Sequence, residues 1–221
     1  MLLETKGLTK IYERRGERFF AADSVDLRVA CDDFVCITGS SGSGKSTLLN
    51  MLTGLLKADG GEILLEGEDI CRLSDTALAH LRNSRLSYIP QGNSLLQNFS
   101  VLDNVCLPWY LTRRDDVKSR ARELLGKVGI AHLEHESPRN LSGGESRRVA
   151  IARSLIVGPA LLIADEPTGD LDPVNTDEVL RLFAEFHAQG LTVILVSHER
   201  QVPLCANRHL VMVNGRLVEG T

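Results

Sequence analysis

Short apolar runs of strand length alternate with segments of helical period along most of the chain. The clearest runs with strand character cover residues 34–38, 86–90, 161–164 and 191–197. Strands that alternate with helices in this way are typical of α/β proteins whose sheet is largely parallel. The hydrophobic pattern therefore predicts an α/β fold with a mostly parallel sheet.

Two regions depart from this alternation. The N-terminal portion and residues 60–67 alternate apolar and polar positions, which indicates a small antiparallel sheet beside the main one. Between the second and third runs the period is mostly helical: residues 100–103 resemble a capping box, and residues 115–128 repeat apolar side chains at helical spacing. This second region therefore predicts a group of helices.

These patterns predict one domain that spans residues 1–221. We expect residues 1–91 and 158–221 to form the sheet core, with the small antiparallel β subdomain at the N-terminal end. Residues 92–157 are expected to form a helical subdomain inserted into that core. No internal repeat marks a second domain.

Polar residues follow each of the four strand-like runs. Residues 39–45 follow the first run and Gln91 follows the second. Asp165 and Glu166 follow the third, and His198 follows the fourth. The carboxyl ends of parallel strands meet at one edge of a sheet, which is where such folds bind ligands. An ordinary polar transition from strand to loop explains any one of these positions equally well, but it has to hold four times.

Composition limits the classes of function. The chain has 221 residues, 43% hydrophobic and 24% charged, which describes a globular unit with a substantial core. Its net charge of −4 argues against a nucleic-acid partner, because proteins that neutralise phosphates are usually basic. The five cysteines form no CxxC pair, so we expect reduced and mostly packed thiols. No apolar run approaches the roughly 18 residues of a membrane span.

A glycine-rich segment, ITGSSGSGKSTLLN at residues 37–50, follows the first run. Its glycines let successive N–H groups face an anion, and residues 39–46 fit the phosphate-loop pattern GxxxxGK[ST]. Lys45 is expected to bridge the outer two phosphates, Ser46 to ligate Mg²⁺ and Thr47 to reach an inner phosphate. The alternative is a flexible glycine-rich turn. The complete predicted phosphate-binding set is Gly39, Ser40, Ser41, Gly42, Ser43, Gly44, Lys45, Ser46 and Thr47.

Two adjacent carboxylates end the apolar run ALLIADEP at residues 160–167. Asp165 is placed to hold Mg²⁺ through water, and Glu166 is then free to polarise an attacking water. Adjacent acids after a strand also serve as simple helix caps. Behind a phosphate loop, the pattern favours hydrolysis with water as the acceptor, because a kinase needs a second substrate pocket and the sequence shows no lid-like arginine segment.

A second helix start with anion-binding character lies at LSGGESRRVAIARSL, residues 141–155. Ser142, Gly143 and Gly144 open this helix, and a helix N-terminus favours anions. Local chemistry alone favours the simpler alternative, a serine N-cap followed by flexible glycines.

The motifs GSSGSGKST, Gln91, LSGGE, LLIADEP, GDLD and His198, in this order, resemble the nucleotide-binding subunit of an ABC transporter. The resemblance covers essentially the whole chain. It implies a P-loop NTPase (RecA-like) core, ATP and Mg²⁺ as cofactors, and transmembrane permease subunits as partners. It further implies a head-to-tail dimer with a second copy of the chain. In this dimer ATP lies between the phosphate loop of one copy and the helix at residues 141–155, called the signature helix, of the other copy.

The resemblance also implies individual roles. Tyr12 would stack on adenine, although taken by itself the residue is better explained as a half-buried strand residue. His198 would contact the γ-phosphate, and Gln91 would touch Mg²⁺ and the attacking water. Residues 169–172, with Asp172 among the nucleotide-binding residues, would link the two sites of the dimer. The implied catalytic residues are Glu166, His198 and Gln91, and the implied metal ligands are Ser46, Gln91 and Asp165.

Among ABC ATPases, the chain most resembles those of lipoprotein-releasing, macrolide-exporting and antimicrobial-peptide-resistance systems. This predicts a peripheral protein on the cytoplasmic face of the inner membrane that helps export or extract a lipoprotein, peptide or drug-like substrate. Three positions depart from that group: Ser40 replaces proline, Arg147 replaces glutamine and Asp170 replaces asparagine or alanine. Pro90 before Gln91 resembles other subfamilies.

Two other classes of ABC protein are alternatives to a transporter subunit, and one segment is predicted to contact the membrane subunit. An ABC-type scaffold or signalling partner of the cell-division type, without solute transport, would share every motif. ABC ATPases that act on DNA or ribosomes usually carry coiled-coil insertions or two ATPase halves, and this sequence has neither. The resemblance places a groove for a membrane-subunit helix at residues 95–110, whose aromatic residues are equally expected to fill the helical core.

Overall fold

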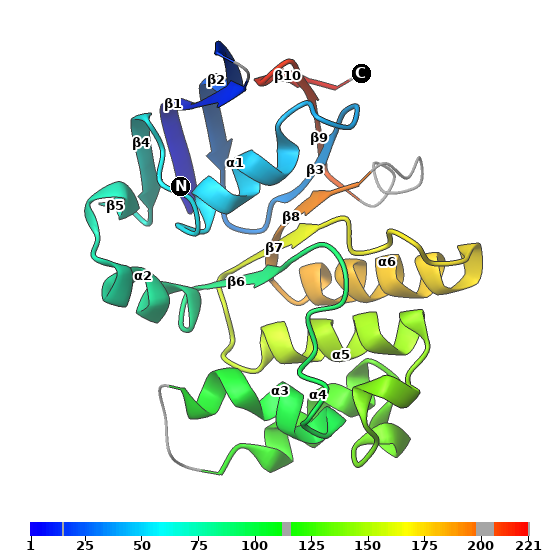
Figure 1. Cartoon of the computed structure of the whole chain (residues 1–221). Coiled ribbons are helices and arrows are strands. Elements are labelled where there is room, and N and C mark those ends of the chain that lie inside the picture. The colour runs from blue at the N-terminus through cyan, green and yellow to red at the C-terminus, as the bar shows by residue number, and fades with distance from the viewer. Residues whose placement is uncertain (15, 112–115, 198–205, 221) are drawn as a thin grey trace.

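The main sheet has six strands in the order β10-β9-β3-β8-β7-β6 (Figure 1). The computed structural model describes residues 1–14, 16–111, 116–197 and 206–220. Strands β9, β3, β8, β7 and β6 are parallel to their neighbours, whereas β10 is antiparallel to β9. The strands are β3 (Phe34–Thr38), β6 (Leu86–Ile89), β7 (Leu161–Asp165), β8 (Thr192–Val196), β9 (Arg208–Val213) and β10 (Arg216–Glu219).

The four predicted strands are confirmed as β3, β6, β7 and β8, with bounds that differ from the prediction by at most one residue at each end. The hairpin β9–β10 was not predicted. Asn214 and Gly215 form its turn with φ angles of 48° and 80°. An Asn-Gly pair between apolar runs is a strong hairpin signal, because both turn positions require positive φ.

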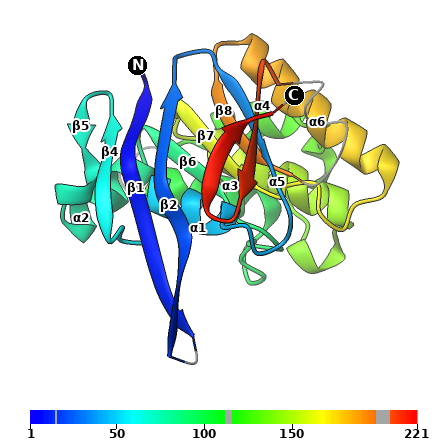
Figure 2. The same ribbon diagram turned by 90° about the horizontal axis from the view of Figure 1, so that it is seen from above.

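The antiparallel sheet predicted for the N-terminal portion is confirmed, with the strand order β2-β1-β4-β5. Its first two strands form a long hairpin that projects from the rest of the molecule in Figure 2. β1 also pairs antiparallel with β4, which contains most of the predicted segment 60–67. The strands are β1 (Leu3–Arg14), β2 (Glu17–Val29), β4 (Gly60–Leu65) and β5 (Glu68–Asp69).

Three helices gather on one side of the main sheet in Figure 1: α3 (Val101–Tyr110), α4 (Lys118–Lys127) and α5 (Gly143–Leu155). Within the described part of residues 92–157 there is no strand, and Ser100 caps α3 as its sequence indicated. The subdomain boundaries at 92 and 157 stay a prediction. The other helices are α1 (Lys45–Leu52), α2 (Asp75–Arg82), α6 (Pro173–Ala188), η1 (Ile70–Arg72), η2 (Ala131–Leu133) and η3 (Pro138–Asn140).

The main sheet is buried on both faces. On β3, Val35 and Ile37 pack into a core shared with α1 and the antiparallel sheet. Phe34 and Cys36 on the same strand pack into a second core shared with α3, α4, α5 and α6. A strand covered on both faces reads as a continuous apolar run, which explains why these strands were the easiest to predict. None of the helices in the described residues is long and apolar enough to cross a membrane.

The cysteines agree only in part with the packing expected of them. Cys36 and Cys106 are buried, whereas Cys31 and Cys71 are exposed, and no disulfide joins cysteines within the described part of the chain. The prediction of mostly packed thiols is therefore right for two of these four cysteines.

Candidate active site

The phosphate-loop segment connects β3 to α1 and is crowded by its neighbours. Gly39 and Gly44 have φ angles of 148° and 108°. A Cβ atom on Gly39 would lie 2.4 Å from the backbone oxygen of Met212, and one on Gly44 would lie 1.9 Å from that of Ala21. These two glycines thus permit the close approach of β2 and β9. Gly42, with a φ of 77°, has no such neighbour, so only its left-handed backbone conformation favours glycine.

Lys45, the first residue of α1, is 5% exposed. Its Nζ donates to the backbone oxygens of Gly39 and Ser40, both at 2.9 Å. Burial lowers the pKa of the ammonium group, while the carboxylates of Glu166 and Asp165 act in the opposite direction. The loop therefore curls around a positive charge that faces two acidic side chains.

The acidic pair lies where β7 ends. Asp165 is the last residue of the strand and is 2% exposed. Glu166 follows with a φ of 47°, and its N–H donates to the oxygen of Val196 at 2.9 Å. The Gln91 side chain reaches this position from the end of β6, since its Nε2 donates to Glu166 Oε2 at 2.7 Å. Burial, together with the charge of Asp165, raises the pKa of Tyr88 to about 12.

A cavity of about 420 Å³ unites half of the predicted site residues. Its lining contains Tyr12 from β1, Gln91, Glu166 and the loop-to-helix segment at Ser41, Gly42, Gly44, Lys45, Ser46 and Thr47. Residues from β1, α1 and the ends of β6 and β7 thus face one space. The prediction that polar strand ends meet at one sheet edge is confirmed for these residues.

Phe19 also lines this cavity, and the sequence analysis missed it. Tyr12 and Phe19 are directly opposite each other in the β1–β2 hairpin. Their ring centroids are 5.9 Å apart, and Lys10 Nζ lies 5.7 Å from the Tyr12 ring. Both rings are partly accessible, at 37% and 46% exposure. The hairpin thus presents an accessible aromatic surface beside the phosphate loop, which nothing local to Phe19 in the sequence indicates.

The predicted signature helix begins with a complete capping box. Ser142 Oγ accepts from the Glu145 N–H at 3.3 Å. Glu145 Oε2 in turn accepts from both the N–H and the hydroxyl of Ser142, each at 2.7 Å. These bonds lower the pKa of the Glu145 carboxyl group. A Cβ on Gly144 would lie 1.9 Å from Asn175 Oδ1, so this glycine permits the Asn175 side chain of α6 to approach closely.

Within the described residues, Ser142, Gly143 and Gly144 do not line the cavity at the phosphate loop. Gly143 instead borders a different cavity of about 240 Å³. One chain therefore holds the two predicted anion sites in separate places.

Asp172 is the N-cap of α6. Its side chain hydrogen-bonds the Asn175 amide and accepts from the N–H groups of Asn175 and Val174, which lowers the pKa of its carboxyl group. The structure thus gives Asp172 a capping function that the resemblance did not supply. His198, predicted at the end of β8, lies outside the described residues.

The segment predicted to receive a membrane-subunit helix divides in two. Leu95 is buried and Trp109 packs against the helical core, whereas Leu96, Phe99 and Tyr110 are 42%, 45% and 40% exposed. Some of its large side chains thus fill the core, as the alternative held, and others remain accessible.

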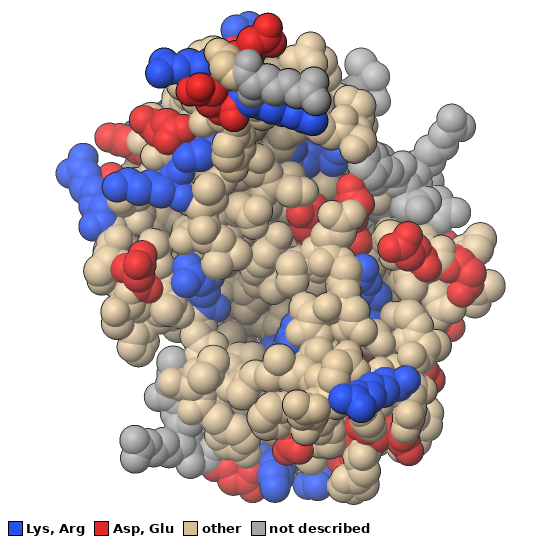
Figure 3. All heavy atoms as spheres, viewed as in Figure 1, with Lys and Arg blue, Asp and Glu red and all other residues tan. Residues whose placement is uncertain are grey.

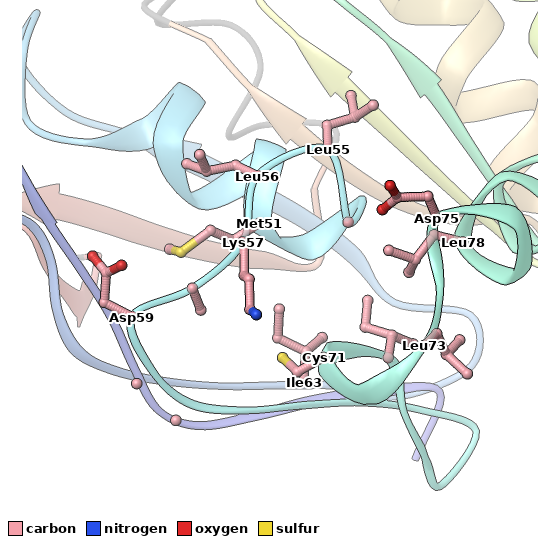
Figure 4. A pocket seen from close by; sticks show the side chains of 15 residues that line it. Met51, Leu55, Leu56, Lys57, Asp59, Ile63, Cys71, Leu73, Asp75 and Leu78 are labelled. Atoms are coloured by element: carbon pink, nitrogen blue, oxygen red, sulfur yellow. The ribbon is translucent and has the colours of Figure 1, made fainter.

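Two wider views of the surface complete the description. Figure 3 shows a face that is hollowed near its centre, with acidic and basic residues scattered around the hollow. A separate cavity of about 460 Å³ lies between the loop after α1, β4 and α2, and Lys57 and Asp59 are among its lining (Figure 4). None of the predicted site residues in the described part of the chain lines this second cavity.

Known proteins are similar to this chain in sequence and in fold. The sequence profile of the ABC transporter family matches residues 22–169. The lipoprotein-releasing system ATP-binding protein LolD of Geobacter metallireducens is 41% identical over 220 residues, which is 98% of each chain. The macrolide export ATP-binding/permease protein MacB of Chlorobaculum tepidum is also 41% identical, over 99% of this chain but only 34% of its own length.

Solved structures agree with these sequence matches. The ATP-binding cassette MJ0796, as a dimer in a post-hydrolysis state with ADP and Pi, superposes with a TM-score of 0.91 at 30% identity, covering 98% of both chains. The cassette MJ1267 in its ADP conformation gives 0.86 at 28% identity and covers 99% of this chain and 91% of its own. The profile match, the relatives and the superpositions together show that the chain belongs to the ABC transporter family, as one of its ATPase domains.

Proposed function

We propose that the chain binds and hydrolyses ATP in the cavity beside the phosphate loop and so powers a separately encoded membrane permease. One observation carries this proposal. The phosphate-loop lysine, the accessible Tyr12 ring and the Gln91–Glu166 pair line the same space of about 420 Å³. Phosphate, base and water chemistry therefore have residues of the appropriate type within one cavity.

The residues present fit a nucleotide. Lys45 already donates to loop carbonyl groups, and its retained charge suits the outer phosphates. The loop runs into the N-terminus of α1, whose unpaired N–H groups and dipole favour anions. Tyr12 offers a ring face for adenine, and Phe19 extends that apolar surface. Ser40, Ser41 and Ser43 belong to the loop that would surround the phosphates.

Magnesium ligation is proposed for Ser46, Gln91 and Asp165. Hydroxyl, amide and carboxylate oxygens are the donors that Mg²⁺ prefers. The chemistry supplied by the bound ion would be neutralisation of charge on the outer phosphates. Ser46 and Gln91 line the cavity, and Asp165 immediately precedes Glu166, which also lines it.

Glu166 is proposed as the general base. Its side chain is held by the Gln91 amide, and its backbone is fixed to β8 through the bond to Val196. A carboxylate in this position can accept a proton from water as the oxygen attacks the γ-phosphate. The contact with the γ-phosphate is assigned to His198 by the motif order.

The complete site is proposed to need a second copy of the chain. Ser142, Gly143 and Gly144 lie apart from the phosphate-loop cavity, so another molecule has to supply this helix end to the nucleotide. Support comes from the cassette MJ0796, which is dimeric in its ADP- and Pi-bound structure. Asp172, beside the signature helix through Asn175, is then proposed to lie at the junction of the two copies.

The proposed physiological role, which includes the permease and the transported substrate, is based on the relatives. Both curated relatives named above belong to systems that release lipoproteins or export macrolides. We infer a peripheral position on the cytoplasmic face of the inner membrane, with a lipoprotein, peptide or drug-like molecule as the substrate of the complete transporter. The exposed Leu96, Phe99 and Tyr110 are proposed to receive a permease helix.

The chemical part of this proposal is tested by Glu166→Gln. Removing a general base is expected to lower ATP turnover by about a hundredfold while ATP affinity survives. Turnover at saturating Mg-ATP and affinity by calorimetry measure the two effects. Near-normal turnover would refute the assignment of Glu166.

Lys45→Ala is the contrasting variant. It removes the charge that faces the outer phosphates, so ATP affinity itself should fall by about tenfold or more. The same calorimetry on both variants separates loss of binding from loss of chemistry. Unchanged affinity in Lys45→Ala would contradict the proposed phosphate cradle.

A further inference from the structure

A buried arginine on α5 holds the chain immediately after Gln91. Arg147 is 8% exposed, and its Nη1 donates to the backbone oxygen of Gly92 at 2.6 Å. The two residues are 55 positions apart in the chain. Removing a guanidinium from water is costly unless charge and hydrogen bonds compensate it, and here burial lowers the Arg147 pKa. A compensating partner is therefore expected nearby.

Asp170 is the acidic residue that acts on this charge, at longer range than a direct ion pair. It lies between β7 and α6, and it lines the same cavity of about 240 Å³ as Arg147 and Gly92. Its negative charge raises the Arg147 pKa, against the effect of burial. Asp170 also has a φ of 65°, a conformation that aspartate, asparagine and glycine adopt most easily. Asparagine or glycine would therefore suit this backbone conformation as well as aspartate. The conformation alone does not explain the acidic side chain.

These contacts close a ring of interactions around the proposed base. Arg147 holds Gly92, and the adjacent Gln91 donates to Glu166. The Gly169 N–H donates to the backbone oxygen of Glu166 at 3.1 Å, and Asp170 follows directly. The ring therefore returns to Arg147 through the charge of Asp170.

We propose that Arg147 and Asp170 form a charge pair that positions Gln91 against Glu166, an inference that rests on the proposed function. Arg147 is a positioning residue, because it acts on the reacting groups through the chain at Gly92. Asp170 acts through Arg147, because its negative charge stabilises the buried guanidinium beside Gly92. Since α5 also begins at the signature serine, Ser142, the pair connects that helix to the hydrolytic end of the other cavity.

A double-mutant cycle tests this order of action. Arg147→Gln should lower kcat for ATP about tenfold, as expected for losing a hydrogen bond to a charged group, with KM changed less than about twofold. Asp170→Asn alone should lower kcat about threefold, because an accessible carboxylate is partly screened by solvent. The double variant should match Arg147→Gln alone, because Asp170 has no further target once the arginine is absent. Arg147→Lys, which keeps the charge, should retain sensitivity to Asp170→Asn.

Arg153 offers a matched control on the same helix. Its guanidinium is also largely buried and donates to the backbone oxygen and hydroxyl of Ser94. Asp170 is not among the causes that shift its pKa, so Arg153→Gln and Asp170→Asn should multiply their effects. Thermal unfolding of every variant separates lost positioning from lost folding.

A readout without nucleotide completes the test. Hydrogen exchange at the amides of Leu95 and Leu96 should accelerate in Arg147→Gln, because the preceding chain loses its anchor. Effects that multiply in the Arg147–Asp170 cycle, or unchanged kcat in Arg147→Gln, would overturn the charge pair. Failure of the wild-type chain to hydrolyse ATP with its permease would instead count against the proposed function, so the two failures are distinguishable.

Discussion

Replacing Gly44 by alanine should destabilise the protein even when no nucleotide is bound. The added Cβ would lie 1.9 Å from the backbone oxygen of Ala21 and 2.9 Å from the Met212 methyl group. The Met212 side chain can rotate away, but the Ala21 oxygen belongs to β2 and moves only with that strand. The substitution therefore combines two costs, a left-handed conformation and a collision with backbone.

The structure sets the size of this effect. A left-handed conformation costs an L-residue about 1–2 kcal/mol. Forcing a backbone shift in a packed region adds about 1–3 kcal/mol. Gly42→Ala provides the matched control, because its φ of 77° carries the first cost while no atom lies within 4 Å of the added Cβ. The loss of unfolding free energy in Gly44→Ala should thus be about twice that in Gly42→Ala.

Thermal unfolding without nucleotide measures the difference. For a domain of this size, each kcal/mol lowers Tm by about 2–4 °C. Gly42→Ala should therefore lower Tm by about 2–8 °C and Gly44→Ala by about twice as much. Equal Tm values for the two variants would refute the argument, because conformational strain would then account for the whole effect. A similar result in saturating ATP would show that the cost belongs to the fold and not to the ligand.

Two further predictions concern assembly. Lys45→Ala and Ser142→Arg should each abolish ATP occlusion in homodimers, but a mixed dimer keeps one composite site with both partners intact, so occlusion should partly return. Mixed dimers, verified by differential tags, that trap no more nucleotide than either parent would contradict a shared site. With the exposed native cysteines replaced by serine, Phe99→Cys should crosslink to the permease and Val218→Cys on β10 should not. Crosslinks confined to Val218→Cys would place the permease at β10 and would contradict the proposed contact at Phe99.

Much of the fold could be predicted because its strands are short and wholly apolar. Each of the four predicted strands is buried on both faces, so its sequence carries an unbroken signal. The hairpin β9–β10 was harder, because its apolar runs are shorter and polar residues stand at the strand ends. Its turn residues, Asn214 and Gly215, carried a strong local signal for a hairpin, which the prediction did not use.

In the site, too, features that depend on one continuous segment could be predicted, whereas contacts between distant segments could not. The phosphate loop is a continuous segment, so spacing alone identified its residues. Gln91 and Glu166 were recognised separately, but their 2.7 Å hydrogen bond depends on β6 and β7 being neighbours. Phe19 enters the cavity through hairpin register, and Arg147 reaches Gly92 through helix packing. No feature near either residue in the sequence encodes those contacts.

The signature helix shows how one sequence motif can support two interpretations at once. In the single chain, Glu145 occupies both the N–H and the hydroxyl of Ser142, so the serine is already satisfied as an N-cap. The carboxylate also places a negative charge at the helix end, where a phosphate from a second copy would arrive. If Ser142 binds that phosphate, we expect the Glu145 contacts to loosen, which would couple nucleotide capture to a rearrangement of the cap. The capping and anion-binding interpretations then describe the same helix end in two states, with the exchange between them set by the second molecule.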